Sequence, residues 1–272
     1  MSGKVPVSVI IIAYNEEDRL PATLASLDWA DQVVVVDSGS IDSTRELAAA
    51  AGADVAEHPW EGYSKQKQFA LTLTRHTWVL WLDADEVVSG ELAASISAAL
   101  EIQGTGDGIY AAYSFNRRTS YLGRLLRFGG WYPDRKVRLF NKELSVFDGA
   151  LIHEGLIVDG EIGFLRGDLY HFSYRDLDHH ISKTHEFAQV WPEQHHDSAP
   201  VRNWEMIVHP AAKAIKSYFV RGGLLEGWRG MILAGMASYS VWLKYALLRE
   251  KQQAASIGSV SSGEGCDDPG ER

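Results

Sequence analysis

The sequence predicts an α/β fold with a mixed sheet and a C-terminal helical extension. Over the first 100 residues, apolar runs of strand length alternate with segments of helical spacing, which is typical of βαβ units in a parallel sheet. After residue 104, strand-like runs follow one another without helices, which predicts a mixed or antiparallel continuation of the sheet. Helical spacing returns at residue 176.

The elements follow in order along the chain. Residues 7–13 form a continuous run rich in β-branched side chains, as expected for a strand buried on both faces. Further strands are predicted at 33–36, 53–58, 79–82, 109–115, 137–140, 155–158 and 169–172. Helices are predicted at about 18–27, 43–51, 63–73, 89–100, 176–194, 204–220 and 226–251. We therefore expect a sheet domain over residues 5–175, a helical extension over 176–251 and a disordered polar tail over 252–272.

Composition narrows the class of protein. With 46% hydrophobic residues the chain can bury a sizeable core, and a net charge of −10 argues against general nucleic-acid binding. Residues 1–100 carry 15 acidic and 6 basic side chains, whereas residues 201–250 carry 7 basic and 3 acidic ones, so the two ends suit different partners. The single cysteine, Cys266, excludes an internal disulfide and fits a reducing compartment. We expect no leader peptide and no membrane-spanning segment.

An apolar run over residues 78–82 ends abruptly at Asp83, Asp85 and Glu86. Grouped carboxylates repel one another, and a bound cation relieves that repulsion. Hard cations such as Mg²⁺ prefer one or two carboxylates plus the oxygens of a bound phosphate. In an open α/β sheet, ligands bind outside the carboxyl ends of the strands, which is where these acids are expected. The motif predicts a divalent-cation site (Mg²⁺ or Mn²⁺) at Asp85 and Asp83; the alternative is a solvated acidic turn that caps the next helix.

Polar side chains also follow the first two predicted strands. Asn15 and Glu16 come after the first strand, and Asp37 ends the second. Asp37 could accept hydrogen bonds from a base or a ribose hydroxyl, and it could also form an Asx-turn with Gly39 in a left-handed conformation. Lys67, near the start of the third helix, either lies on a solvated face or reaches a diphosphate. No glycine-rich phosphate-binding loop is present, which argues against a nucleotidyltransferase.

Three motifs therefore stand in order at the ends of the first, second and fourth strands. They are Ala13-Tyr14-Asn15-Glu16, Val36-Asp37-Ser38-Gly39-Ser40 with Asp42 and Thr44, and Leu82-Asp83-Ala84-Asp85-Glu86. Together they resemble the inverting nucleotide-sugar glycosyltransferases of family 2, whose fold is the Rossmann-like GT-A type. Segments 131–140, 153–154, 169–172 and 221–230 are similar to the bacterial branch that builds lipopolysaccharide core, which includes glucosyltransferases. The resemblance covers roughly residues 5–250.

The resemblance implies a role for each matching residue. Contacts to the nucleoside are implied for Asn15, Glu16 and Asp37. Lys67 would lie near the diphosphate, Asp83 would touch the ribose or the donor sugar, and Asp85 would ligate the metal.

Inverting transfer is one in-line displacement, so it needs a carboxylate within about 3 Å of the acceptor hydroxyl. It also needs positive charge at the leaving diphosphate. Glu154 is the candidate base, with Asp134 in reserve; the alternative for Glu154 is a surface glutamate in a hairpin. Arg138 either serves the diphosphate or is an exposed strand arginine. His171 either supplies a third metal ligand, since imidazole suits Mn²⁺ moderately, or is a structural histidine.

The C-terminal third combines basic, aromatic and apolar residues. Residues 230–243 form a stretch of 14 uncharged positions, which is too short to span a bilayer. The basic residues around it are Lys213, Lys216, Arg221 and Arg229. This pattern predicts a segment that lies on an anionic membrane surface. The alternative is a helical hairpin packed on the core or on a second subunit.

The function predicted from these observations is metal-dependent, inverting transfer of a hexose onto a cell-surface glycolipid such as lipopolysaccharide core. UDP-glucose is the favoured donor. The expected partners are the nucleotide sugar, the glycolipid acceptor and the inner face of the cytoplasmic membrane, and the expected location is cytoplasmic. Two alternatives stay open: a transferase for another surface polysaccharide, and a sugar-nucleotide-binding scaffold without catalysis. The sequence leaves the oligomeric state undetermined.

Overall fold

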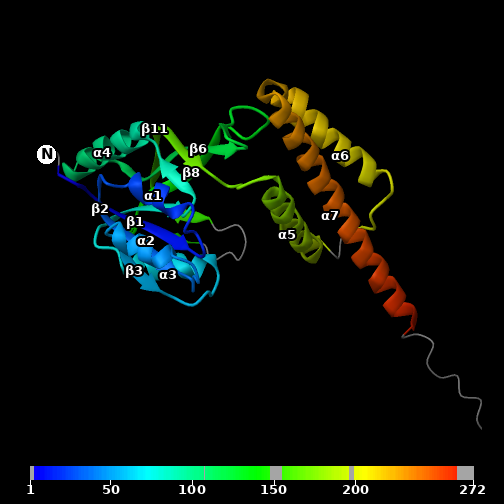
Figure 1. The fold of residues 1–272 in the computed structure, drawn as a ribbon, viewed down its shortest axis with the longest axis horizontal. Helices are drawn as coiled ribbons and strands as arrows, with labels where there is room; N and C mark the ends of the chain where they lie inside the picture. The colour runs from blue at the N-terminus through cyan, green and yellow to red at the C-terminus, as the bar shows by residue number, and fades with distance from the viewer. Residues whose placement is uncertain (1–2, 107, 148–154, 196–198, 262–272) are drawn as a thin grey trace, which may run out of the picture. The chain divides into compact units, whose positions relative to one another are not determined.

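A computed structural model describes residues 3–106, 108–147, 155–195 and 199–261 (Figure 1). The chain divides into two compact units. Unit 1 comprises residues 1–125 and 131–173 and holds the sheet, and unit 2 comprises residues 126–130 and 174–272 and is helical. The predicted base Glu154 lies outside the described residues.

Unit 1 alternates strands and helices in its first half and contains strands alone in its second. The elements of the first half are β1 (Val5–Ala13), α1 (Leu20–Ala25), β2 (Ala30–Asp37), α2 (Thr44–Ala50), β3 (Asp54–Glu57), α3 (Tyr63–Thr72), β4 (Trp78–Asp83), β5 (Glu86–Val88) and α4 (Gly90–Gly104). The strands of the second half are β6 (Tyr110–Tyr121), β7 (Arg124–Leu125), β8 (Asp134–Asn141), β9 (Ser145–Phe147), β10 (Leu156–Val158) and β11 (Glu161–His171).

The main sheet has the strand order β3-β2-β1-β4-β8-β6-β11-β5, with β7 paired to β6. Strands β1 to β4 are mutually parallel, whereas β8 runs antiparallel to both β4 and β6. The predicted α/β fold with a mixed sheet is therefore confirmed. The predicted strand at 155–158 forms instead a separate two-stranded sheet, β10 with β9. The sequence analysis also missed β5, whose three residues pair with β11 directly after the acidic turn.

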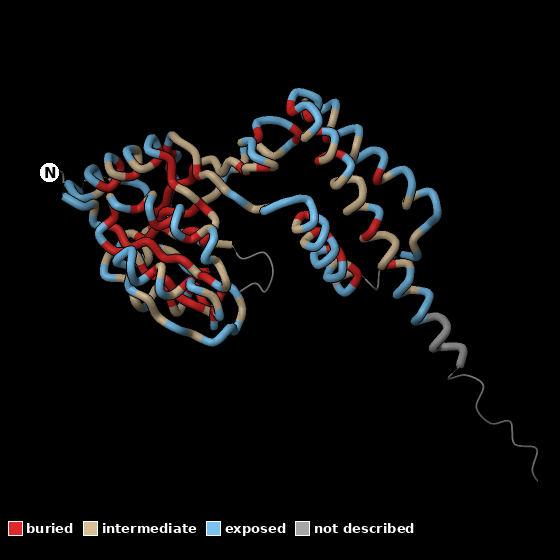
Figure 2. The backbone as a smooth tube through the Cα atoms, in the orientation of Figure 1, coloured by how far each residue is buried: buried red, intermediate tan, exposed pale blue. Residues whose placement is uncertain are grey.

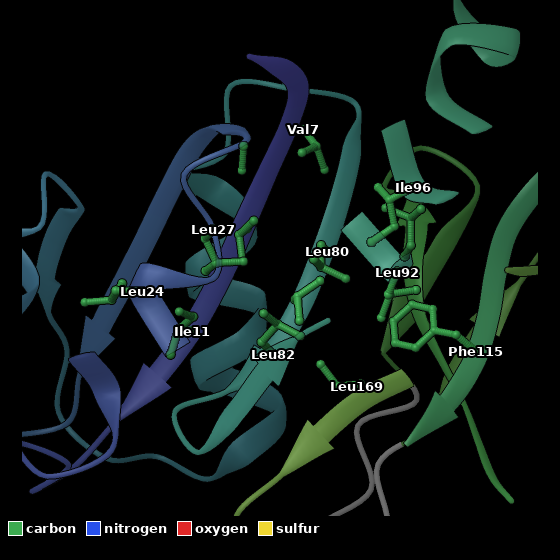
Figure 3. Packing of buried hydrophobic residues seen from close by; sticks show 14 of the residues in the cluster. Val7, Ile11, Leu24, Leu27, Leu80, Leu82, Leu92, Ile96, Phe115 and Leu169 are labelled. Carbon is green, nitrogen blue, oxygen red and sulfur yellow. The ribbon is translucent and has the colours of Figure 1, made fainter. Parts of the chain in front are cut away.

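Hydrophobic clusters cover both faces of β1, as its sequence predicts. Alternate residues of a strand point to opposite faces, and Val9 and Ile11 pack in one cluster while Ile10 packs in the other. The first cluster includes residues of α1, α2 and α4, and Figure 3 shows part of its packing. The second cluster includes Ala70 of α3. The tube in Figure 2 is accordingly red along the central strands. This packing fixes the carboxyl ends of β1, β2 and β4 beside one another.

Unit 2 contains α5 (Leu177–His195), α6 (Glu205–Ile215), the π-helical turn η1 (Lys216–Val220), the 3₁₀ turn η2 (Gly223–Glu226) and α7 (Trp228–Ser261). The predicted helix at 204–220 thus changes its hydrogen-bonding pattern at Lys216. Helix α7 begins after Gly227, which has a φ of +63°, and it runs to Ser261. Residues 252–261 are therefore helical rather than part of a disordered tail, since Gln and Ala favour helix.

Segment 126–130 belongs to unit 2 because of one buried acid. Glu226 is buried, and its Oε1 accepts the backbone N–H groups of Arg127 at 2.7 Å and Phe128 at 3.0 Å. The Gly129 N–H donates to the Arg221 carbonyl at 2.7 Å. These bonds satisfy backbone N–H groups that would otherwise need water or another acceptor as a hydrogen-bond partner.

Part of α7, Trp228–Ala255, is by length and composition alone long and apolar enough to cross a membrane. The expectation that no segment is long enough to span is therefore wrong. That expectation rested on the run of uncharged residues at 230–243 alone, whereas a membrane-spanning helix tolerates one or two charged residues near its ends.

Candidate active site

The acidic turn after β4 is held by basic side chains from distant elements. Asp83 ends β4, and its Oδ2 accepts a hydrogen bond from the Arg138 Nη2 of β8 at 2.9 Å. Asp85 lies in the turn, and its Oδ2 is 3.2 Å from Arg19 Nη1. The N-cap of α4 is Ser89, whose hydroxyl accepts the Leu92 N–H. The acids are thus not the cap of the next helix, which was the alternative interpretation.

Glu86 lies beneath this turn and is fully buried. Its Oε1 is 3.1 Å from Arg138 Nη2 and 3.5 Å from Arg117 Nη1, and its Oε2 accepts the Asp83 backbone N–H at 3.0 Å. Burial raises the pKa of Glu86 to about 7, although both arginines oppose the shift. For Asp83, desolvation would raise the pKa, but attraction to Arg138 and then Lys67 outweighs it and lowers the pKa to about 2. At neutral pH Asp83 is therefore ionised, while Glu86 holds its proton more readily than an exposed glutamate does.

Two buried cations lie against the same indole ring beside this turn. The Nζ of Lys67 is 3.3 Å from the ring centroid of Trp81, and the Cζ of Arg138 is 3.8 Å from it. Lys67 and Arg138 are each only 4% exposed, so the solvated lysine and the exposed strand arginine, which were the alternatives, are both wrong. Within the described part of the chain, Arg138 Nη1 and Trp81 Nε1 are buried donors without a hydrogen-bond partner. Such donors are unfavourable unless a ligand accepts from them.

His171 ends β11 next to Asp85. Its Nε2 is 3.5 Å from Asp85 Oδ1. Burial lowers the pKa of His171 to about 4, although Asp85 opposes the shift, so the imidazole is neutral at pH 7 and can donate a lone pair to a metal. Within the described ranges, no group of three or more His, Cys, Asp or Glu residues could hold a metal ion alone. A carboxylate and an imidazole at this spacing fit a cation whose remaining ligands come from a bound phosphate.

The turns after β1 and β2 are tied together by their polar side chains. Asn15 has a φ of +53°, and its N–H donates to Ser40 Oγ at 2.9 Å while its Oδ1 accepts the Ile41 N–H at 2.9 Å. Asp37 is fully buried, and its Oδ1 accepts the N–H groups of Gly39 at 3.1 Å and Ser40 at 2.9 Å. Its Oδ2 accepts the Ser40 hydroxyl. In this structure Asp37 builds the Asx-turn, with Gly39 at a φ of +96°.

The remaining predicted residues lie nearby or outside the described chain. Glu16 forms a bidentate pair with Arg19, whose Nε and Nη2 are each 2.7 Å from the carboxylate. Asp134, the reserve base, is 2.8 Å from Arg117 and 3.1 Å from Lys136. Ion pairs therefore link Glu16 through Arg19 and Asp85 to His171. A second chain links Asp83 through Arg138 and Glu86 to Arg117 and Asp134.

The sequence analysis missed three members of this cluster: Arg19, Trp81 and Arg117. Trp81 could have been found, because it lies two positions before Asp83 on the same strand and so shares a face with it. Arg19 and Arg117 meet the acids only through the tertiary fold, and nothing in their local sequence marks them.

Comparison with known proteins identifies the family to which this fold and cluster belong. A family model described as glycosyl transferase family 2 matches residues 8–153, more than half of the chain. The chain belongs to glycosyl transferase family 2, and its fold is the GT-A type.

Individual relatives are consistent with this assignment. The lipopolysaccharide core biosynthesis glycosyltransferase LpsC of Rhizobium meliloti (strain 1021) is 29% identical over 267 residues, which cover 91% of this chain and 96% of that protein. An uncharacterized glycosyltransferase of Rickettsia typhi is 28% identical over 266 residues, with 90% and 87% covered. Among solved structures, S. aureus TarS in complex with UDP-GlcNAc is similar with a TM-score of 0.46 and 16% identity, covering 93% of this chain and 92% of that one.

Proposed function

We propose that this protein transfers a hexose from a nucleotide sugar, with UDP-glucose the favoured donor, onto a glycolipid of the lipopolysaccharide core type. The family supplies the reaction class, glycosyl transfer. The glycolipid acceptor is suggested by similarity to LpsC along nearly the whole of both chains. Transfer is proposed to invert the anomeric configuration, because a single displacement from the far side of the sugar does so.

One observation carries the assignment of the donor site. Lys67 and Arg138 are buried against Trp81, and among the described residues Arg138 Nη1 and Trp81 Nε1 have no hydrogen-bond partner. A buried, concentrated positive charge suits a leaving diphosphate, whose charge grows as the glycosidic bond breaks. Its position at the carboxyl ends of parallel strands is where α/β sheets bind ligands.

The proposed chemistry follows from the residues around this site. The acceptor hydroxyl oxygen forms a bond to the anomeric carbon as the bond to the diphosphate oxygen breaks. The proton passes to a carboxylate, for which Glu154 is proposed and Asp134 is the reserve. The electron pair stays on the diphosphate, beside Lys67 and Arg138. A divalent cation, Mg²⁺ or Mn²⁺, held by Asp85 with His171 and Asp83 would add positive charge at the diphosphate.

The proposal places the acceptor on the cytoplasmic leaflet and the protein on its surface. Six apolar side chains around η1, η2 and the start of α7 are each more than half exposed: Phe219, Val220, Leu224, Leu225, Trp228 and Met231. Arg221 and Arg229 lie in the same stretch. Exposed apolar and basic residues together favour an anionic membrane surface.

A panel of nucleotide sugars tests the donor assignment. Purified protein is incubated with each donor and a core-type glycolipid acceptor, and release of the nucleoside diphosphate is measured with and without chelator. We expect UDP-glucose to give the highest rate, chelator to abolish it, and NMR of the product to show an inverted anomeric centre. Retention would exclude the single displacement. Donor binding without turnover on any acceptor would favour the non-catalytic scaffold, and turnover only on another polysaccharide would favour the first alternative.

A further inference from the structure

A hollow with a mostly apolar lining and three lysines lies within unit 2, bounded by α5, α6, η1 and α7. Its volume is about 420 Å³, which is in the range of small-molecule sites. Its lining includes Trp191, His209 and Tyr245 together with three lysines: Lys213, Lys216 and Lys244. None of these residues belongs to the candidate active site in unit 1.

The three lysines supply the positive charge of the hollow. Among the described residues, none of the three forms an ion pair, whereas Lys251 on α7 is 2.8 Å from Glu193. Glu205 is an acid whose charge reaches one residue of the hollow, Tyr245. Burial is the main cause that raises the pKa of Tyr245, and the negative charge of Glu205 adds to it. Its Oε2, however, accepts the Arg202 backbone N–H at 2.7 Å. Like charges grouped in this way repel one another, and an anion would relieve that repulsion.

The aromatic residues give the hollow a defined wall. His209 Nδ1 lies 2.6 Å from the Tyr245 hydroxyl, and the Trp191 and Tyr245 rings are 5.6 Å apart between centroids. A rigid aromatic wall beside several ammonium groups provides both an apolar contact and charge. This combination suits a ligand that is anionic at one end and apolar at the other.

We propose that this hollow binds the phosphate-bearing headgroup of an anionic lipid. The charge of the region supports this occupant, since residues 201–250 carry 7 basic and 3 acidic side chains in a chain of net charge −10. The same unit exposes large apolar side chains that a lipid surface would cover. The inference rests on the membrane contact proposed above but not on transferase activity. A site of this kind would fix the protein to particular lipids, rather than to negative charge in general.

The experiment uses the full chain and two matched variants. The pocket variant is K213Q/K216Q/K244Q. The control variant, K183Q/R202Q/K251Q, removes the same number of charges from the same unit but outside the hollow. Circular dichroism and thermal unfolding establish that both are folded. Binding to vesicles is measured by co-sedimentation, without donor or acceptor. The vesicles are phosphatidylcholine with about 30% phosphatidylglycerol, which gives a strongly anionic surface.

We expect the pocket variant to bind these vesicles at least about tenfold more weakly than wild type, and the control variant within about twofold of it. A photoreactive phosphatidylglycerol should crosslink to peptides that contain Trp191 or Tyr245. Equal loss in both variants, or crosslinks elsewhere, would show that charge alone drives binding and would overturn the pocket. Competition by inorganic phosphate as effective as that by a soluble short-chain phosphatidylglycerol would show a free-anion site instead. Absence of wild-type binding to any vesicle would reject the membrane contact itself and leave the transferase assignment untouched.

Discussion

The turns after β2 and β4 both hold buried or partly buried acids, but they stabilise them in opposite ways. Asp37, after β2, is satisfied by its own turn, through Gly39 and Ser40. Asp83 and Asp85, after β4, are held by arginines that reach them from other elements. A carboxylate satisfied by backbone N–H groups is fixed for structure. One satisfied by arginine side chains from other elements can exchange them for a ligand, so the β4 turn is where chemistry is expected.

The largest expected effect concerns whether the β4 cluster also supplies the base. Glu154→Gln should lower kcat by roughly 10²–10⁴-fold with little change in donor affinity, since general-base loss has that range. Asp134→Asn is the comparison, because Asp134 belongs to the cluster through Arg117 and Lys136. Steady-state kinetics with donor titration decides between them. A mild Glu154 variant and a severe Asp134 variant would transfer the role to Asp134.

The next effect tests the β4 turn itself. Asp85→Asn keeps the size of the side chain but removes the charge beside His171 and Arg19, so we expect turnover to fall by about 10²–10³-fold while the fold survives. Activity is measured across a titration of Mn²⁺ and Mg²⁺. A folded variant with near-normal turnover, or wild-type turnover unaffected by chelator, would show that Asp85 does not bind a cation needed for catalysis.

At the β2 turn the same type of substitution should act mainly on stability. Asp37→Asn replaces one of two accepting carboxylate oxygens with an NH₂ group that can only donate, in a fully buried place. The free energy of unfolding should fall by about 1–3 kcal/mol, and donor KM should rise because the turn positions Asn15 through Ser40. Urea denaturation and kinetics measure the two. If Asp37→Asn lost activity as severely as Asp85→Asn with unchanged stability, the contrast between the turns would be wrong.

The sequence predicts the features that are built from adjacent residues, and it does not predict those that the tertiary fold assembles. The β1 strand and the Asp37 turn are encoded by adjacent residues, so apolar runs and turn chemistry suffice to predict them. The β5 strand was missed because its three residues are ordered by β11, which lies some 80 residues further along the chain. Arg117 was missed for the same reason: its partners Glu86 and Asp134 lie on β5 and β8, and only the fold brings them together.

A smaller effect separates two neighbouring lysines of α3. Lys67 is buried against Trp81, whereas Lys65 is exposed and 3.2 Å from Glu61. Lys67→Gln should weaken binding of the donor nucleotide about tenfold, near 1.4 kcal/mol, and Lys65→Gln should change it by less than about 0.5 kcal/mol. Calorimetric titration with UDP and with UDP-glucose compares the two variants. Similar losses in both would mean that general charge, and not the buried cation pair, attracts the diphosphate.

A further effect is a pH dependence that arises from Glu86. Its pKa is raised from 4.5 to about 7 in the folded protein, chiefly by burial, so between these values the folded state holds a proton that the unfolded state has lost. Raising the pH through this window therefore favours unfolding. Glu86→Gln cannot titrate, and the unfolding free energy of wild type relative to this variant should be lower at pH 8 than at pH 5. The lowered pKa of His171, about 4, gives a slope of opposite sign between about 4 and 6.5, but it is present in both proteins and cancels in the difference. Urea denaturation of both proteins at the two pH values measures that difference. A wild type that gains on the variant as the pH rises would show that Glu86 is ionised beneath the turn, held there by Arg138 and Arg117.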